Sequence, residues 1–322
     1  MSVLVERAGF LSSVQDLGRT GFRQFGVSPG GALDLFALRI ANLLAGNDDD
    51  AAGLEITLGG LQLRFENDRL VAWCGGDFDV RLGSKVIPPG HTAYVGAGEQ
   101  LKFGHPKTGC RCWLAISDGV DVPITLESRS TDLRAGFGGW HGRVLRDGDV
   151  VPLRKARELL ALESGISSWT APHEWVSPAK VEPVLRIVRG VDWHRFGASA
   201  LHFLTSKAFT VLPDSDRMGV RLDGPELRRI NEGDLISEAV VAGTIQVPPS
   251  GKPILLLGDC QTIGGYPKIA HVITVDLGVA AQLRAGDHVR FAEVSLADAH
   301  ALIVERERQL ELFRVGVSLH NS

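Results

Sequence analysis

Glycines separate short apolar runs along most of this chain, and this punctuation limits the possible folds more than any other feature. There are 38 glycines among 322 residues. Many stand at turn positions between short runs rich in Val, Leu, Ile and Phe, which is typical of strands joined by tight turns. We predict strands at residues 54–58, 61–65, 70–74, 78–82, 92–95, 100–103 and 110–117. A mainly β protein, arranged as a meander or a barrel, follows from this pattern.

A small turn motif recurs in both halves of the chain. A glycine next to an acidic residue opens an alternating strand pattern at residues 97–103, 146–153 and 284–291. Glycine permits a positive φ, the acid can bond neighbouring backbone, and the alternation places one strand face in a core. The recurrence suggests two related β domains, and the length of the chain agrees with two.

The domain boundaries follow from composition. Residues 166–183 are rich in Ser, Pro, Trp and Ala and show no clear periodicity, so we place a linker there. The first β domain is then residues 1–165 and the second is 184–322, which includes a closing helix. We expect few helices, all peripheral, at residues 34–45, 192–203 and 296–313.

Charge and composition exclude several classes of protein. The chain has 34 basic and 38 acidic residues and a formal net charge of −4, which gives no electrostatic footprint for nucleic acid or an anionic membrane. No apolar run reaches the length of a membrane span, and Glu6 and Arg7 interrupt the place where a signal peptide would be apolar. Four cysteines are too few for a secreted disulfide scaffold. We expect a cytoplasmic protein with reduced thiols.

Motif searches remove further chemistries. The sequence has no Walker phosphate loop, no strand-coupled G-x-G-x-x-G and no H-E-x-x-H, and its ten histidines lack ligand spacing, so we predict no metal site. Residues 26–30 match the G-x-S-x-G elbow of serine hydrolases around Ser28. An elbow needs a strand that runs straight into a helix, and here Pro29 intervenes. We therefore interpret Ser28 as a helix-entry or substrate-loop residue.

The strongest candidate site combines two polar loops, at residues 215–221 and 259–268. Adjacent glycines in the second loop let backbone approach a ligand closely. The carboxylates of the two loops would act as a base or hold a cation, and their arginines and lysine would clamp a carboxylate or phosphate. The amide and hydroxyl groups of the second loop would bind a planar amide. The candidate catalytic residues are Asp216, Asp259 and Lys268, and the candidate substrate-binding residues are Arg217, Arg221, Gln261, Thr262 and Tyr266. The alternative is a set of internal ion pairs that stabilise the loops.

Two other polar segments remain open to two interpretations. Asp16 and Arg19, in the turn-rich segment 13–22, either form a buried pair that pins a loop or face a substrate. Glu55 lies in an otherwise apolar strand and either faces solvent or enters a cleft. The hydroxyl-rich loop at residues 128–139 is interpreted as a turn whose side chains satisfy backbone groups.

Seven motifs, in order along the chain, carry a resemblance to a known family. They are SVQDLGRTGF, GALDLFALRIANLLAGN, LEITLGG, SRSTDLRAG, SDRMGVRLDG, GTIQVPPSGKPILLLGDCQTIGGYPKIA and AQLRAGDHVRF. With them the chain resembles allophanate hydrolase subunit 2, a family also named after the C subunit of 5-oxoprolinase, over nearly its whole length. That family also includes an antagonist of a sporulation kinase inhibitor and a domain of biotin-dependent urea carboxylases. The resemblance implies a pair of cyclophilin-like β-barrel domains.

Membership of this family would imply partners and a reaction. The partners are allophanate hydrolase subunit 1, also called the 5-oxoprolinase B subunit, and the hydrolytic A subunit of 5-oxoprolinase; the complex would use ATP with Mg²⁺ to open the lactam of 5-oxoproline to glutamate. In that reaction Arg217, Arg221 and Lys268 would neutralise phosphate or carboxylate. Gln261 and Thr262 would orient the amide, and Asp216 or Asp259 would handle Mg²⁺ or a proton. The sequence shows no Walker loop and no Ser-Ser-Lys amidase signature, so the nucleotide site is not placed and direct allophanate hydrolysis is not expected.

Two alternatives come from other classes. One is a biotin-dependent, urea-type carboxyltransferase module, which would need a separate carrier because the chain has no biotinylation motif. The other is a non-catalytic partner that sequesters its subunit 1.

Overall fold

The computed structural model describes residues 1–155, 165–176, 180–230, 233 and 235–320. These residues form two compact units, each assembled from segments distant in sequence. Unit 1 comprises Met1–Arg19, Gly30–Ala179 and Gln309–Ser322, and unit 2 comprises Thr20–Pro29 and Lys180–Arg308. The sequence predicts a single division of the chain, at a linker of residues 166–183, and the observed division differs from it. Residues 20–29 belong to unit 2, and residues 309–322 belong to unit 1.

Unit 1 is built on a ten-stranded antiparallel sheet. The pairing path runs β10-β7-β5-β8-β4-β1-β9, with β2, β3 and β6 attached at its sides. The strands are β1 Ser2–Ala8, β2 Leu11–Gln15, β3 Gly53–Thr57, β4 Leu61–Phe65, β5 Arg69–Leu82, β6 Lys85–Val86, β7 His91–Val95, β8 Gln100–Ile116, β9 Val150–Pro152 and β10 Ile166–Thr170. The prediction of a mainly β protein is confirmed.

β5 and β8 are longer than the sequence predicted. Each joins two predicted strands into one, because the pairing continues through three register shifts around Asp77. A β-bulge of this kind bends a strand without ending it. The interruption of the apolar pattern near Asp77 therefore marks bulges within a continuous strand and not a turn between two strands.

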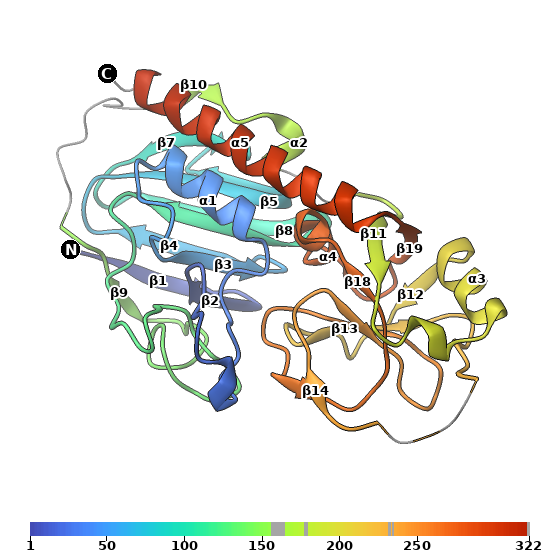
Figure 1. Ribbon diagram of the computed structural model, residues 1–322. Helices are drawn as coiled ribbons and strands as arrows, with labels where there is room; N and C mark the ends of the chain where they lie inside the picture. Colours follow the sequence, from blue (N-terminus) through green and yellow to red (C-terminus); the bar gives the residue numbers. More distant parts are fainter. Residues whose placement is uncertain (156–164, 177–179, 231–232, 234, 321–322) are drawn as a thin grey trace. The chain divides into compact units, whose positions relative to one another are not determined.

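The core of unit 1 follows the alternation along the strands. Trp73 packs edge-to-face against Phe78 and Phe103, with ring centroids 6.4 Å apart in both pairs. Helix α1, Leu35–Leu44, covers β5 and β8 on one side of the sheet (Figure 1). As the sequence predicted, this helix begins after Asp34, whose side chain accepts a hydrogen bond of 3.0 Å from the backbone N–H of Ala37.

An aromatic cluster packs the C-terminal helix against the expected linker within unit 1. The expected linker contains β10 and the short helix α2, His173–Val176, while its residues 177–179 lie outside the described part of the chain. Trp169 stacks on Phe313 at 5.0 Å, and Trp175 meets the same ring edge-on at 5.8 Å. Helix α5, Leu296–His320, is longer than predicted because Leu310, Phe313 and Val317 are buried in its last turns.

Unit 2 is a closed seven-stranded barrel. Its strands close in the order β11-β18-β15-β16-β13-β12-β19. Neighbouring strands are antiparallel except β11 and β19, which are parallel. The strands are β11 Val184–Arg189, β12 Phe209–Val211, β13 Gly219–Asp223, β15 Thr244–Gln246, β16 Ile254–Leu256, β18 Lys268–Val272 and β19 His288–Glu293. The expectation of two barrels is therefore only partly confirmed. Unit 2 is a closed barrel, whereas unit 1 is built on a large antiparallel sheet.

Smaller elements complete unit 2. A two-stranded ribbon pairs β14, Glu238–Ala239, with β17, Ile263–Gly264. The helix expected at residues 192–203 is divided into a 3₁₀ turn, Trp193–Arg195, and helix α3, Ala198–Ser206; helix α4 is Leu277–Ala280. Among the residues that the structure describes, no helix is both long and apolar enough to cross a membrane.

The recurring glycine-acid turn has the same local structure in all three places. The acidic side chain accepts a hydrogen bond from the backbone N–H three residues earlier: Glu99 from Gly96 at 2.7 Å, Asp149 from Arg146 at 2.8 Å and Asp287 from Arg284 at 3.0 Å. The first two turns lie in unit 1 and the third in unit 2. The sequence motif therefore predicts a real local structure that both units use.

Candidate functional site

The barrel of unit 2 buries a lysine at the start of β18. The side chain of Lys268 is 6% exposed, and its Nζ lies 2.8 Å from Oε2 of Glu238 and 3.6 Å from Oδ2 of Asp192. A buried ammonium is costly unless it keeps charged or polar partners. The two partners differ in accessibility, because the Asp192 side chain is 10% exposed and the Glu238 side chain is 61% exposed.

Asp192 fixes the position of Lys268 in several ways. Its Oδ2 accepts the backbone N–H of Lys268 at 2.9 Å, and its own backbone N–H donates to the carbonyl of Lys268 at 3.2 Å. Its Oδ1 accepts Nε of Arg195 at 2.9 Å. The backbone comes close here, since a Cβ on Gly190 would lie 2.1 Å from the Lys268 carbonyl. The lysine is thus held in one place by buried contacts.

Two carboxamides lie in the same part of the barrel. Gln246, 2% exposed, faces Lys268 across the β15–β18 pairing, where the register shifts by one residue. Its Oε1 accepts Nε2 of Gln261 at 3.4 Å, and its Nε2 donates to the carbonyl of Tyr266 at 3.3 Å. β17 approaches this side chain closely, since a Cβ on Gly264 would lie 2.7 Å from Gln246 Nε2. The cluster of Lys268, Gln246 and Gln261, with Asp192 and Glu238, is called the lysine cluster below.

Arg217 and Asp259 form a separate buried ion pair. Arg217 Nε donates to Asp259 Oδ2 at 2.7 Å and Nη2 donates to Oδ1 at 3.0 Å, with side chains 6% and 8% exposed. The pair spans the start of β13 and the end of β16, and the backbone N–H of Asp259 also donates to the Arg217 carbonyl at 3.2 Å. Bidentate geometry of this kind is the strongest form of the Arg–carboxylate contact. It agrees with the alternative that these residues stabilise the two loops.

The other predicted residues of unit 2 lie around these two groups. Oδ1 of Asp216 accepts the backbone N–H groups of Met218 at 2.8 Å and Gly219 at 3.2 Å, so it shapes the turn before β13. Arg221 points to the surface, where Nε lies 3.0 Å from Asp214 Oδ2 and the side chains are 51% and 65% exposed. The Thr262 carbonyl accepts the N–H of Val240 at 3.1 Å.

Burial also changes the titration of two neighbours. Burial, and secondarily the charge of Lys268, lower the pKa of His271, whose Nδ1 lies 3.2 Å from Thr244 Oγ1. Burial raises the pKa of the Cys260 thiol to about 11, although the Arg23 guanidinium acts in the opposite direction. Near neutral pH the thiol is therefore protonated and unsuited to act as a nucleophile.

Asp16 and Arg19 form their contacts inside unit 1. The Asp16 carboxylate accepts hydrogen bonds from Gly18 N–H at 2.8 Å, from Ser128 Oγ at 2.6 Å, and from Arg129 N–H and Ser130 Oγ. The Arg19 guanidinium donates to the Ser130 carbonyl and lies 4.8 Å from the centre of the Phe137 ring. Both residues tie the hydroxyl-rich loop to the end of β2 through these separate contacts.

Glu55 and Ser28 also have defined places. Glu55 is fully buried, and its Oε2 accepts Trp113 Nε1 at 2.9 Å and the N–H of Leu33 at 3.0 Å. The prediction that it faces solvent or a cleft is wrong, because internal N–H donors satisfy the carboxylate. Ser28 lies in an irregular segment between a 3₁₀ turn, Arg23–Phe25, and α1, so the strand-to-helix geometry of a hydrolase elbow is absent at this described position.

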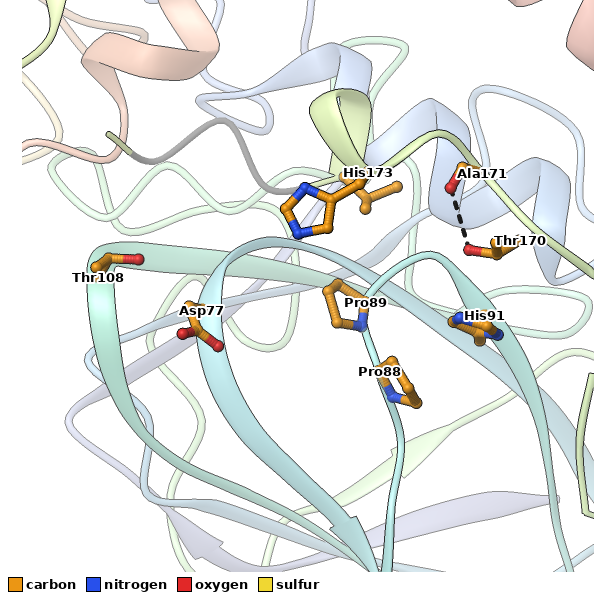
Figure 2. Close-up of a pocket in the computed structure, with 9 residues that line it drawn as sticks. Asp77, Pro88, Pro89, His91, Thr108, Thr170, Ala171 and His173 are labelled. Atoms are coloured by element: carbon orange, nitrogen blue, oxygen red, sulfur yellow. Dashed lines mark hydrogen bonds between the residues drawn. The ribbon is translucent and has the colours of Figure 1, made fainter. Parts of the chain in front are cut away.

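A pocket of about 520 Å³ opens in unit 1 (Figure 2). Asp77 and Thr108, cross-strand neighbours on β5 and β8, lie on one side, with His91, His173 and two prolines around the rest. Nδ1 of His91 lies 3.0 Å from the Ser167 carbonyl. None of the residues predicted from the sequence lines this pocket. We place the candidate site at the lysine cluster instead, because a buried cation whose strand partner is one of two linked carboxamides is a more specific recognition set than this open hollow.

The residues expected to handle Mg²⁺ or phosphate have partners within the chain. No group of three or more His, Cys, Asp or Glu side chains in the described part of the chain is arranged to hold a metal ion. Arg217 is engaged by Asp259, and Lys268 by two carboxylates. We assign no nucleotide contact to these residues.

Sequence reasoning missed three members of the lysine cluster. Gln246 carried a signal, because it is a polar residue at the end of a short apolar strand. Asp192 was noticed as the start of a helix and not as a partner of a lysine 76 residues away. Glu238 carried no signal, since nothing local distinguishes it from other exposed glutamates.

Comparison with known proteins gives the class of the chain. Residues 25–293 match the family model described as "Carboxyltransferase domain, subdomain A and B". The chain therefore belongs to this carboxyltransferase domain family. The crystal structure of the K. lactis urea amidolyase is similar in fold, with a TM-score of 0.90 and 28% identity, over 97% of this chain and 20% of that one.

Two curated relatives match along nearly their whole length. The chain is 38% identical to the C subunit of 5-oxoprolinase from Escherichia coli over 315 residues, which is 98% of each protein. It is also 38% identical to the C subunit of 5-oxoprolinase from Haemophilus influenzae over 304 residues, or 94% of each protein. The resemblance seen in the sequence motifs is confirmed, and the chain is a homologue of the 5-oxoprolinase C subunit.

Proposed function

We propose that this chain is the C subunit of an ATP-dependent 5-oxoprolinase, which opens the lactam of 5-oxoproline to glutamate together with the A and B subunits as partners. The observation that carries the proposal is the full-length similarity to the C subunits of two bacteria. The four cysteines are buried thiols, which is compatible with the reducing cytoplasm in which we place the complex.

The lysine cluster offers the groups that such a substrate needs. 5-Oxoproline carries a carboxylate and a planar lactam amide. The ammonium of Lys268 would bind the carboxylate, and the carboxamides of Gln246 and Gln261 would pair with the lactam N–H and C=O, donor to acceptor. Because both carboxamides are partly engaged with each other, binding would exchange their mutual hydrogen bond for bonds to the amide.

The difficult step is the attack on a resonance-stabilised amide. ATP would supply the activation that makes the lactam carbonyl a better electrophile. The contribution of this chain would be to hold the substrate in place and to keep its amide aligned, and positioning of this kind lowers a barrier substantially. Asp216, Asp259, Arg217, Arg221, Thr262 and Tyr266 remain candidates around this site, with Asp259 and Arg217 also serving to hold the loops.

Reconstitution tests the proposal. The purified chain would be mixed with its A and B subunits, and ADP and glutamate would be followed with 5-oxoproline, allophanate or urea supplied in turn. We expect glutamate and ADP from 5-oxoproline when all three subunits are present. The absence of turnover with every substrate would overturn the enzyme proposal.

A variant tests the role of Lys268. Lys268→Met keeps the length of the side chain and removes its charge, and we expect kcat/KM to fall about 100-fold, as for loss of a buried charged contact. Lys252→Met is the matched control, because Lys252 is a partly exposed lysine of the same unit, paired with Asp223 at 2.8 Å. Full turnover by Lys268→Met would remove this residue from the site and would favour a purely regulatory partner role.

A carboxyltransferase role is the second candidate, favoured by the matching family model and by the fold similarity to urea amidolyase. The same cluster would then present a urea-like acceptor to a carboxylated biotin on a separate carrier. Retention of a biotinylated carrier on the chain, with transfer of labelled carboxylate to urea, would support this candidate. Its absence alongside 5-oxoproline turnover would exclude it.

A further inference from the structure

The two carboxylates that hold Lys268 differ in a way that bears on ligand binding. Asp192 is tied to the lysine backbone and to Arg195, so it cannot leave without breaking several buried contacts. Glu238 has an exposed side chain and sits on the two-residue strand β14. Asp192 is thus a fixed partner of Lys268, whereas the Glu238 side chain can leave the lysine and enter solvent.

Val240 anchors the ribbon that carries Glu238. Val240, next to β14, is 1% exposed and packs in a small core with Leu256 and Cys260. Its N–H donates to the Thr262 carbonyl at 3.1 Å, and its own carbonyl accepts Arg23 Nη2. The backbone of the ribbon can therefore stay in place while the Glu238 side chain turns outward into water.

We infer that Glu238 occupies the carboxylate-binding position at Lys268 when no ligand is bound, and that the carboxylate of an anionic substrate displaces it. The inference rests on the proposed function for the identity of that substrate, 5-oxoproline. A carboxylate of a ligand can make the same ammonium contact that Glu238 makes at 2.8 Å. Asp192 remains as the fixed partner, so the lysine keeps its position throughout the exchange.

This competition sets the apparent affinity for anions. A ligand must displace an intramolecular group, so its apparent dissociation constant equals the intrinsic value divided by the fraction of molecules in which Glu238 has left the site. The contact has one exposed partner, and such pairs are weak. Removing the competing charge is therefore expected to strengthen binding about fivefold.

The first test uses the reconstituted complex. Glu238→Gln keeps the size of the side chain and removes its charge; we expect KM for 5-oxoproline to fall about fivefold, with kcat changed less than twofold. Inhibition by 2-pyrrolidinone, a neutral lactam without a carboxylate, is expected to be unchanged. The matched control is Glu226→Gln, since Glu226 is also an exposed glutamate of unit 2 and pairs with Arg228 at 2.8 Å. An unchanged KM in Glu238→Gln, or an equal fall in both variants, would overturn the inference.

The second test uses the full chain alone and does not depend on turnover. Acetate is titrated into chain labelled with ¹⁵N at its lysine side chains, and the NMR signal that is lost in Lys268→Met reports on this site. We expect acetate to bind Glu238→Gln about fivefold more tightly than the unsubstituted chain. If this holds while 5-oxoproline is not turned over, the displacement stands and the substrate is a different anion. If turnover occurs and acetate affinity is the same in both proteins, the proposed function stands and the displacement fails.

Discussion

Unit 1 and unit 2 each bury a group of polar side chains that the sequence marks as candidates for substrate contact. In unit 1 Asp16 accepts hydrogen bonds from four donors, and every one of these donors belongs to the same unit. In unit 2 the ammonium of Lys268 contacts two carboxylates, the buried Asp192 and the exposed Glu238. Each group is centred on a buried ionisable side chain, since Asp16 is 6% and Lys268 is 5% exposed.

The difference lies in what can be exchanged. The donors to Asp16 are backbone N–H groups and short hydroxyls, and Ser128 and Ser130 are themselves almost fully buried. Replacing these contacts with a ligand would mean unfolding the loop that carries the two serines. At Lys268 a single side chain turns away to open the contact. Burial of a charged residue is therefore no guide to function by itself; the accessibility of its partner is more informative.

The largest expected effect lies in unit 1. Asp16→Ala removes a carboxylate that accepts four hydrogen bonds and leaves their donors unsatisfied. We expect the free energy of unfolding to fall by about 3 kcal/mol, the cost of losing several bonds to a charged acceptor. Urea denaturation measures it.

The control for this prediction is Asp79→Ala. Asp79 pairs with Arg81 at 2.9 Å on the surface of the same unit, and its loss is expected to cost less than about 0.5 kcal/mol. In the folded complex, KM of Asp16→Ala for 5-oxoproline should match that of the unsubstituted protein. A stable Asp16→Ala protein with a raised KM would instead place Asp16 at the substrate and would remove the contrast between the two units.

Local sequence patterns predicted local structure well. The helix at residues 34–45, the strand at residues 61–65 and the three glycine-acid turns all follow from interactions within a few residues. The breaks within β5 and β8 were misplaced because a bulge and a turn share the same composition, and only cross-strand pairing distinguishes them.

The candidate site was predictable only in part, for the same physical reason. Motifs located Lys268 and Gln261, because both stand in one glycine-rich loop. The sequence could not show whether Arg217 contacts a ligand or Asp259, because these two residues are 42 positions apart. In the fold they form a bidentate pair. Glu238 was invisible because its role depends on the barrel that brings it to Lys268. The segment 20–29 joins unit 2 through tertiary packing, which composition does not record.

A smaller effect is expected from pH, and it tests the electrostatics of the lysine cluster. The pKa of His271 is lowered by burial and by the charge of Lys268, so the folded state favours the neutral imidazole. Above the usual histidine pKa of about 6.5 both folded and unfolded chains are neutral there, and nothing is lost. As the pH falls below that value the unfolded state binds the proton first, so stability declines until the folded pKa is passed.

Urea midpoints between pH 5 and pH 8 measure this slope, and His271→Gln should reduce it. His288→Gln is the control, because His288 is an exposed histidine of the same barrel whose Nδ1 lies 3.1 Å from Thr210 Oγ1. In Lys268→Met the slope should also become shallower, since one of the two causes is removed. An unsubstituted slope in Lys268→Met, with a reduced slope in His271→Gln, would show that Lys268 does not act on His271. An unsubstituted slope in His271→Gln would show that His271 does not cause the pH dependence.

The smallest effect is expected at Arg221, and it marks the outer limit of the site. Its ion pair with Asp214 is exposed on both sides, so Arg221→Gln is expected to change the free energy of unfolding by less than about 0.5 kcal/mol. KM for 5-oxoproline should change less than twofold in the reconstituted complex, whereas Lys268→Met acts strongly in the same assay. A KM raised more than fivefold by Arg221→Gln would extend the anion-binding surface to β13. Burial of the cation would then not be needed for substrate contact, because Arg221, itself 51% exposed, would act like the buried Lys268.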